Sequence, residues 1–218
     1  MSGIQQMLTG GTYKPAPPTT IGQAYGGGFY AGKISTTANG VATHYLIVAP
    51  KASGEALYQK WGTSGVTTAQ TSVIDGPTNS AVEAALGAAY QAAKFCEDLN
   101  IGTYSDWYLP AKNELEVLYY FLKPTAAPNL TVYDSGSNAN AVSPEPVSQN
   151  YTSGSPAQTS AGIGFRTGET NAFSSDYYWS STEENSNNAW AQDFFNGYQY
   201  GSDKTNTLPV RAVRRIAV

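Results

Sequence analysis

Charged side chains are scarce in this chain of 218 residues. Asp, Glu, Lys and Arg together make up 13% of it, about half of the roughly 25% that is typical of soluble domains. The net charge is -4, so the chain offers no basic field that could displace the counterions of a phosphate backbone. The composition therefore argues against a nucleic-acid partner.

Cysteine and histidine are nearly absent, with one residue of each, Cys96 and His44. A single cysteine excludes a disulfide within the chain and a multi-cysteine zinc site. His44 alone could still be a base or a metal ligand, but no Ser-His-Asp motif accompanies it. We favour a structural His44 at the start of an apolar strand and a buried, unreactive Cys96 on a helix face. We therefore expect no enzyme activity, no cofactor and no metal site.

Long hydrophobic runs are also missing. No stretch approaches the roughly 20 apolar residues of a membrane-spanning helix. The opening, MSGIQQMLTGG, lacks both the positively charged region and the apolar run of a secretion signal. We expect a protein that is made in the bacterial cytoplasm without a signal peptide and is not inserted into a membrane.

Tyrosine and glycine, by contrast, are abundant, with 16 and 22 residues. Tyrosine-rich surfaces that also contain Ser, Asn and Gly are typical of recognition sites, because tyrosine gives a large contact area at a low cost in side-chain entropy. An ordinary β-rich core with polar loops has a similar composition. Composition alone leaves both interpretations open.

The first part of the chain is predicted to be an extended N-terminal segment followed by β-strands. Residues 1–20 contain the stretch YKPAPPTT, whose prolines favour an extended linker, and we predict an attachment segment there. Asn39-Gly40 is a hairpin signal between two apolar runs. The predicted strands are 26–34, 43–50 and a shorter one at 56–62.

Two helices are predicted in the middle of the chain. The first covers 80–99, where Ser80 and Glu83 have the spacing of a capping box. The second covers 110–123 and begins with Pro110, which suits the first helical position. Apolar stripes at helical spacing are formed by Val82, Leu86, Ala89, Ala93 and Cys96 in the first helix, and by Leu115, Leu118, Tyr119 and Leu122 in the second.

Residues 124–172 are rich in Pro, Ser, Asn, Thr and Gly. They predict a long, irregular insertion with little core of its own. Short strands separated by amide- and glycine-rich turns are predicted after it, at 177–181, 188–195, 198–201 and 208–216. The order of hairpin, two helices, long loop and several strands predicts an α+β fold around one core.

Motifs between about Ala92 and Arg215 carry a family resemblance: SDWYLPAKNEL, then YWSSTE, NAW and VRAVRR. Together they resemble a C-type-lectin-like domain family of phage tail proteins and bacterial surface proteins, close to the variable proteins of diversity-generating retroelements. The resemblance implies two helices packed on a small, twisted, mostly antiparallel sheet, with neighbouring termini. Residues 21–218 would form this ligand-binding domain, with 124–172 as its loop-rich insertion.

In the diversified relatives, scaffold residues near the C-terminus alternate with exposed residues that contact a partner. Carried over by motif, the scaffold would be Trp179, Ser180, Ser181, Glu183, Ala189, Trp190, Phe194, Gly197, Val210, Arg211, Ala212 and Arg214. The exposed, variable residues would be Glu184, Asn185, Asn187, Ala191, Gln192, Asp193, Phe195, Asn196, Tyr198, Gln199, Tyr200, Ser202, Asp203, Thr205 and Asn206.

The aromatic residues of this region divide into two groups. Phe194 and Phe195 are adjacent, so both cannot face the core of a regular strand. We expect Phe194 to be buried with Trp179 and Trp190. Exposed Phe195, Tyr198 and Tyr200, ringed by amides, would have the composition of a binding hot spot, although they could also be the rim of the core. The predicted ligand-binding residues are Glu184, Asn185, Asn187, Gln192, Asp193, Phe195, Asn196, Tyr198, Gln199, Tyr200, Ser202 and Asp203.

The arginines near the C-terminus also have two interpretations. Arg211, Arg214 and Arg215 could bind an anionic ligand. We favour ion pairs that hold strands together, although isolated surface pairs would contribute little. The predicted partners are Glu183, Glu184 or Asp193.

Two rival functions lack their motifs. Calcium-dependent sugar binding uses a Glu-Pro-Asn or Gln-Pro-Asp turn and a Trp-Asn-Asp run, but 143–148 reads SPEPVS and 188–194 reads NAWAQDF. The formylglycine-generating enzymes share the lectin-like fold but rely on a pair of active-site cysteines. Cys96 alone cannot supply that pair.

We therefore predict a non-enzymatic adhesin: a phage tail or tail-fibre receptor-binding protein on the virion tail, whose C-terminal face recognises a protein or glycan on the host cell. Its other partners would be tail or fibre subunits, and a homotrimer would fit a tail tip. Several copies on one particle would raise a weak affinity through avidity. The alternative is a structural or decoration component of the tail that does not touch the receptor.

Overall fold

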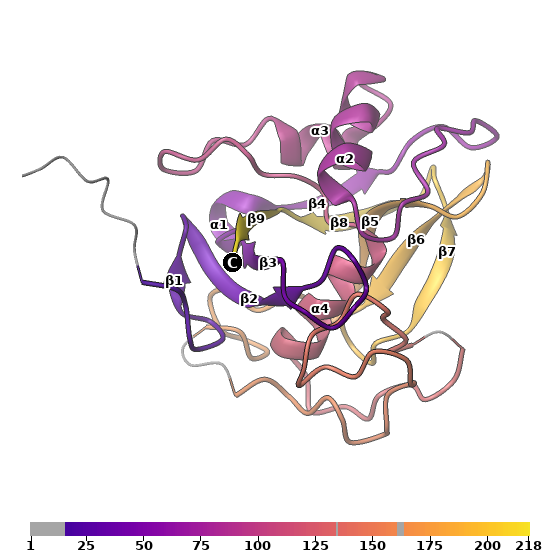
Figure 1. The fold of residues 1–218 in the computed structure, drawn as a ribbon. Helices are drawn as coiled ribbons and strands as arrows, with labels where there is room; N and C mark the ends of the chain where they lie inside the picture. Colours follow the sequence, from indigo (N-terminus) through magenta and orange to yellow (C-terminus); the bar gives the residue numbers. More distant parts are fainter. Residues whose placement is uncertain (1–15, 134, 161–163) are drawn as a thin grey trace, which may run out of the picture.

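The computed structural model describes residues 16–133, 135–160 and 164–218, so most of the predicted attachment segment, 1–20, lies outside the described residues. The described elements form an α+β fold with antiparallel pairing in three sheets (Figure 1). In chain order they are β1 (Ala24–Tyr25), β2 (Gly28–Ile34), β3 (His44–Val48), α1 (Lys51–Gly54), β4 (Glu55–Lys60), α2 (Gly76–Ala85), α3 (Gln91–Glu97), α4 (Lys112–Leu122), β5 (Tyr177–Glu183), β6 (Asn188–Asp193), β7 (Gln199–Asp203), β8 (Thr207–Arg211) and β9 (Val213–Ala217).

The largest sheet joins the two ends of the described chain. Its strand order is β1-β2-β3-β9, so the last strand pairs with β3 (Figure 1). In this register Val48 lies opposite Val213. The hairpin predicted at Asn39-Gly40 is confirmed: it connects β2 to β3, and Gly40 has a φ of +74°, which glycine adopts without strain.

The other sheets are β4-β8 and β5-β6-β7. The strand predicted at 208–216 is therefore divided, because β8 pairs with β4 and β9 pairs with β3. The chain changes sheets at Ala212, whose N–H donates to the carbonyl of Gly54 at 2.9 Å while its carbonyl accepts from the N–H of Ala49 at 3.0 Å.

The single helix predicted at 80–99 is wrong. The chain forms two short helices, α2 and α3, and Gly87 lies between them with a φ of +99°, which interrupts helical geometry. Ser80 and Glu83 are buried within α2 and form no capping box, and Ser80 Oγ instead accepts from the N–H of Leu109 at 3.0 Å. Each helix turns its own face inward. Val82, Leu86 and Ala89 of the predicted stripe are consequently exposed, whereas Ala93 and Cys96 are buried.

The second predicted helix is confirmed as α4, which begins two residues later than Pro110 suggested. Ala111 precedes it, and its N–H donates to Glu114 Oε2 at 2.9 Å. The whole predicted stripe is buried: Leu115, Leu118, Tyr119 and Leu122.

The insertion at 124–172 contains no helix or strand among its described residues. It nevertheless supplies buried side chains to the main core, because Tyr151 and Phe165 pack in one cluster with residues of β3 and α4. A second cluster contains three buried tryptophans, Trp61, Trp107 and Trp179. The loops of the insertion lie below α4 in Figure 1, whereas α2 and α3 lie above the sheets.

Candidate functional site

Four tyrosines make a continuous series of ring contacts at the β5-β6-β7 sheet. Tyr198 and Tyr200 are stacked, with centroids 5.7 Å apart and planes 11° apart. Tyr200 meets Tyr177 at 4.7 Å, and Tyr198 meets Tyr133 of the insertion at 5.6 Å. We call Tyr133, Tyr177, Tyr198 and Tyr200 the tyrosine row. Segments far apart in the sequence therefore build one surface.

The register of the sheet explains the row. In β6, the middle strand, Ala191 lies between Trp179 of β5 and Tyr200 of β7. The small side chain of Ala191 leaves space for rings from the outer strands to meet over β6. Residues two apart on a strand point to one face, so Tyr198 and Tyr200 share a face as predicted.

The row is accessible to a ligand. Tyr133 is 72% exposed, and the other three side chains are half-buried. Tyr133 has a φ of +59°, a backbone conformation that is uncommon for residues other than glycine. No hydrogen bond between described residues uses the hydroxyl of any of the four tyrosines. The hydroxyls can therefore donate to or accept from a ligand.

The expected division between Phe194 and Phe195 is confirmed. Phe194 is fully buried and stacks on Phe173 with centroids 4.0 Å apart. Phe195 is 48% exposed, and its carbonyl accepts from Thr125 Oγ1 at 2.7 Å. The turn between β6 and β7 thus presents an aromatic side chain to solvent.

The tip of the β5–β6 hairpin presents Glu184, Asn185 and Asn187, which are exposed as predicted. Asn185 Oδ1 accepts from the N–H groups of Asn187 and Asn188 at 2.8 and 2.9 Å, which stabilises the turn. Glu184 lies across β7, because a Cβ placed on Gly201 would come within 1.8 Å of its Oε2. These side chains hold the tip in a defined shape.

Exposure was wrongly predicted for Ala191 and for four of the predicted ligand-binding residues, all of which are buried. Gln199 Nε2 donates to Gln192 Oε1 at 2.6 Å, and Gln192 Nε2 donates to the carbonyl of Gly197 at 3.0 Å. The amides therefore bond to each other inside the sheet. The four buried residues are Gln192, Asp193, Gln199 and Ser202.

The remaining predicted ligand-binding residues, Asn196 and Asp203, are half-buried and shape turns. Asn196 Oδ1 accepts from the N–H of Tyr198 at 3.0 Å, and Asp203 Oδ1 accepts from that of Thr205 at 2.9 Å. Thr205 and Asn206 are exposed, as the resemblance implied.

Among the aromatics expected in the core, Trp179 is buried, but Trp190 is only half-buried. Lys112 Nζ lies 4.0 Å from the centroid of the Trp190 ring. The prediction of a fully buried Trp190 is therefore wrong: the side chain of Lys112 lies over the ring, where other core residues were expected.

The three arginines form ion pairs, but their predicted partners are wrong. Each reaches across the fold to a residue that precedes the insertion rather than to one on the C-terminal strands. The pairs are Arg211 with Glu55 at 3.0 Å, Arg214 with Asp106 at 2.7 Å and Arg215 with Glu114 at 2.7 Å.

His44 and Cys96 sit in structural surroundings. His44 Nδ1 lies 3.0 Å from Thr43 Oγ1, and burial together with the Arg215 charge lowers the pKa of the imidazole. Cys96 is fully buried, and burial raises the pKa of its thiol, which disfavours the reactive thiolate. No group of three or more His, Cys, Asp and Glu residues in the described part of the chain could hold a metal ion.

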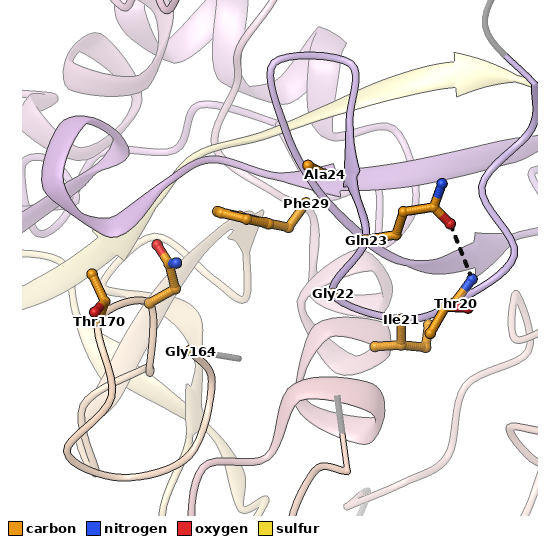
Figure 2. Close-up of a pocket in the computed structure, with 9 residues that line it drawn as sticks. Thr20, Ile21, Gly22, Gln23, Ala24, Phe29, Gly164 and Thr170 are labelled. Atoms are coloured by element: carbon orange, nitrogen blue, oxygen red, sulfur yellow. Dashed lines mark hydrogen bonds between the residues drawn. The ribbon is translucent and has the colours of Figure 1, made fainter. Parts of the chain in front are cut away.

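A second candidate is a cavity of about 580 Å³ near β1, within the size range of small-molecule sites. In Figure 2, Ile21, Gln23 and Phe29 line one side, while Gly164 and Thr170 of the insertion line the other. Gln23 Oε1 accepts from the N–H groups of Thr19 and Thr20 at 3.1 and 3.4 Å. None of the lining residues is titratable, so the cavity offers apolar and hydrogen-bonding contacts rather than acid–base groups.

Two members of the tyrosine row were not among the predicted ligand-binding residues. Tyr177 carried a misleading signal: it lies two residues before Trp179, which was expected in the core, and residues two apart on a strand share a face. Tyr133 carried none, because the insertion has no regular period that fixes which side chains point outward.

No helix in the described ranges is both long and apolar enough to cross a membrane. No curated protein matches the chain. Among solved structures, a fimbrial protein from Bacteroides ovatus ATCC 8483 is similar at 16% identity and a TM-score of 0.37. The alignment covers 82% of this chain and 36% of that one, so this chain spans little more than a third of that protein.

A family model matches most of the chain. The Lcl C-terminal domain matches residues 59–214, a range that contains the whole tyrosine row. The resemblance drawn from the sequence motifs is thereby confirmed. The chain belongs to the Lcl C-terminal domain family, a domain of phage and bacterial surface proteins that is associated with C-type-lectin-like variable proteins.

Proposed function

We propose that this chain is a non-enzymatic receptor-binding domain of a phage tail or tail fibre, and that the tyrosine row contacts a protein or glycan on the host cell. The observation that carries the proposal is the row itself. Four tyrosine rings from the insertion, β5 and the β6–β7 hairpin touch one another, and their hydroxyls are unused by the described residues. Large aromatic area with free hydroxyls is the composition of binding hot spots.

Rigidity beneath the row supports the same proposal. The buried pair Gln192 and Gln199 ties β6 to β7 directly under the tyrosines. A surface that is already ordered loses little conformational entropy when it binds. The buried amides therefore position the row instead of contacting the ligand.

For the fold, we propose a C-type-lectin-like arrangement, with α4 and the α2–α3 pair packed on a small antiparallel framework closed by the C-terminal strand. The pairing of β9 with β3 and the burial of the α4 stripe support this. In such a fold the β5–β7 hairpins form a platform at one side, with the helices away from the ligand.

The affinity of a single tyrosine row for its ligand would be modest, and assembly of several copies would raise the apparent affinity. A homotrimer with other tail or fibre subunits would present several rows to one host cell and raise the apparent affinity through effective concentration. In this account the chain works on the virion tail.

The test is adsorption of phage particles that carry Tyr133→Ala or the double change Tyr198→Ala with Tyr200→Ala. We expect adsorption to host cells to fall on the order of tenfold or more, because hot-spot truncations commonly cost over ~1 kcal/mol each. Tyr58→Ala is the matched control, since Tyr58 is 74% exposed on β4, outside the row, and also has a positive φ, of +59°. Assembled particles that adsorb normally with all three changes in the row would instead support a structural or decoration role.

A further inference from the structure

A buried lysine lies against an asparagine carboxamide where α4 meets the insertion. Lys123 follows the last residue of α4 and is 1% exposed, and Asn129 is 5% exposed. Lys123 Nζ lies 2.6 Å from Asn129 Oδ1. Its other two hydrogen bonds go to backbone carbonyls, those of Ala127 at 2.5 Å and Pro156 at 3.3 Å. No ion pair between described residues includes Lys123.

The asparagine is held in one orientation by all of its polar atoms. Its Nδ2 donates to the carbonyls of Thr152 and Pro156 at 3.0 and 2.8 Å. Its Oδ1 accepts from Lys123 Nζ and from the Tyr119 hydroxyl, the latter at 2.7 Å. Because carbonyls surround Nδ2 and donors surround Oδ1, the network assigns the carboxamide oxygen to the lysine side.

This geometry places an amine beside an electrophilic carbon. Oδ1 is bonded to Cγ at about 1.2 Å, so Lys123 Nζ lies no more than about 3.8 Å from Cγ. That is close to the separation from which aligned groups react. The site is also closed to water, which would otherwise compete as a nucleophile.

The surroundings favour the neutral, nucleophilic amine. Burial lowers the pKa of Lys123 to about 8, so roughly a tenth of the amine is unprotonated at pH 7 and about half at pH 8. When the ammonium loses the proton that it donates to Oδ1, the lone pair faces the carboxamide while the other two N–H groups still donate to Ala127 and Pro156. Burial, and secondarily the charge of Glu116, raise the pKa of Tyr119, so its hydroxyl stays a proton donor.

We infer that Lys123 Nζ and Asn129 Cγ become joined by an intramolecular amide bond with release of ammonia. The neutral amine attacks Cγ to form the Nζ–Cγ bond, and the Tyr119 hydroxyl stabilises the oxygen of the tetrahedral intermediate, as an oxyanion donor does. Nδ2 takes up one proton from Nζ, the Cγ–Nδ2 bond breaks, and Nδ2 leaves as ammonia. One amine and one carboxamide thus become one secondary amide and one ammonia, without any oxidant or co-reactant, and the proton that Lys123 lost before the attack is taken up by the released ammonia.

The bond would change the junction in two ways. It would replace a buried ammonium, which is costly without a carboxylate partner, with a neutral amide. It would also fix the start of the insertion to the end of α4. Only residues 124–128 lie in the loop that the bond closes, so the stabilisation from the lower entropy of the unfolded chain would be small. The main effect would be a covalent cross-link at a junction that hydrogen bonds of Tyr119, Thr152 and Pro156 already hold in place.

The intact mass of the denatured full chain tests this. We expect wild-type protein to be lighter than its sequence by one ammonia, with no fragment ions from backbone cleavage between 123 and 129. Lys123→Arg and Asn129→Ala should restore the full sequence mass. Lys94→Arg is the matched control, because Lys94 forms an exposed pair with Asp98 at 2.7 Å, and it should keep the deficit.

The role of Tyr119 has a separate readout. Tyr119→Phe keeps the ring but removes the donor, so the deficit should appear on the order of tenfold or more slowly in freshly made protein. Wild-type protein that retains its full sequence mass after long incubation of the folded chain above pH 8 would overturn the inference. A deficit that persists in Lys123→Arg would overturn it as well, because the ammonia would then come from another residue.

Discussion

Lys204 Nζ lies 2.5 Å from Glu183 Oε1, and both side chains are buried. The same carboxylate accepts from the N–H groups of Thr68 and Ala69 at 3.0 and 2.8 Å. Lys204 Nζ also donates to the carbonyl of Ser186 at 3.0 Å. Although burial pushes the pKa of Glu183 upward, the hydrogen bonds of Lys204 and of the two amides outweigh it and hold that pKa below its usual value. One buried ion pair thus fastens the β5–β6 hairpin to a neighbouring loop.

Breaking this pair should destabilise the fold. Lys204→Met leaves a buried carboxylate without its cation, which typically costs about 3–5 kcal/mol. Urea denaturation of the variant should show a lower midpoint with an unchanged slope. The double change Lys204→Met with Glu183→Leu should recover much of the loss, since an apolar pair can replace a buried ion pair. A Lys204→Met protein within about 1 kcal/mol of wild type would show that the pair is not a structural anchor.

Gly197 should not tolerate a side chain. It has a φ of +82°, and an added Cβ would lie 2.6 Å from Cε1 of the buried Tyr119. Gly197→Ala should therefore cost about 2–4 kcal/mol, from backbone strain and overpacking together. Gly40→Ala is the matched control, because Gly40 has a φ of +74° with nothing within 4 Å of the added Cβ, so strain alone should cost about 1 kcal/mol. Equal losses in the two variants would contradict the packing at Gly197.

Stability should fall as the pH rises from about 5 to about 8, because buried carboxyl groups resist ionisation. Burial raises the pKa of Glu145 from 4.5 to about 8, and Asn138 only partly offsets this. In that range the folded chain keeps a proton that the unfolded chain has released. The stabilising contribution is therefore complete below the unfolded pKa and lost as the pH approaches 8. Glu116 and Glu83 have pKa values raised in the same direction by burial.

Glu145→Gln isolates this contribution, since glutamine stays neutral in both states. The free energy of unfolding, measured in urea at several pH values, should lose about 1.4 kcal/mol less per pH unit than in wild type over this range. Parallel pH profiles for the two proteins would mean that Glu145 ionises normally in the folded chain.

The sequence predicted a helix correctly only where large apolar residues recur at helical spacing, as they do in α4. In α4 every residue of the predicted apolar stripe is buried, and residues on its other sides, such as Glu114 and Glu116, are buried as well. In 80–99 the run of alanines suited a helix on either side of Gly87, and local pattern could not show that α2 and α3 turn different faces inward. The division of 208–216 at Ala212 depends on pairing with β4 and β3, two strands distant in sequence.

The candidate site was predictable at the adjacent aromatic residues, at the alternating Tyr198 and Tyr200, and at the exposed tip of the β5–β6 hairpin. Phe194 and Phe195 had to diverge, and they do. Gln192 and Gln199 were expected to be exposed because the resemblance places them between scaffold residues, but their opposite positions on β6 and β7 allow the two side chains to hydrogen-bond in the interior. The contact of Tyr133 with Tyr198 joins the insertion to the C-terminal hairpin, and no local pattern encodes such a long-range contact.

Equilibrium binding of the purified full chain to envelopes of its host tests the central claim most directly. The double change Tyr198→Ala with Tyr200→Ala, and Tyr133→Ala alone, should each raise the dissociation constant about tenfold or more. Tyr58→Ala should leave it unchanged, and Tyr133→Ala, at a 72% exposed side chain, should also leave the urea midpoint unchanged. Undiminished binding by both row variants, with intact folding, would contradict the assignment of the tyrosine row as the binding surface.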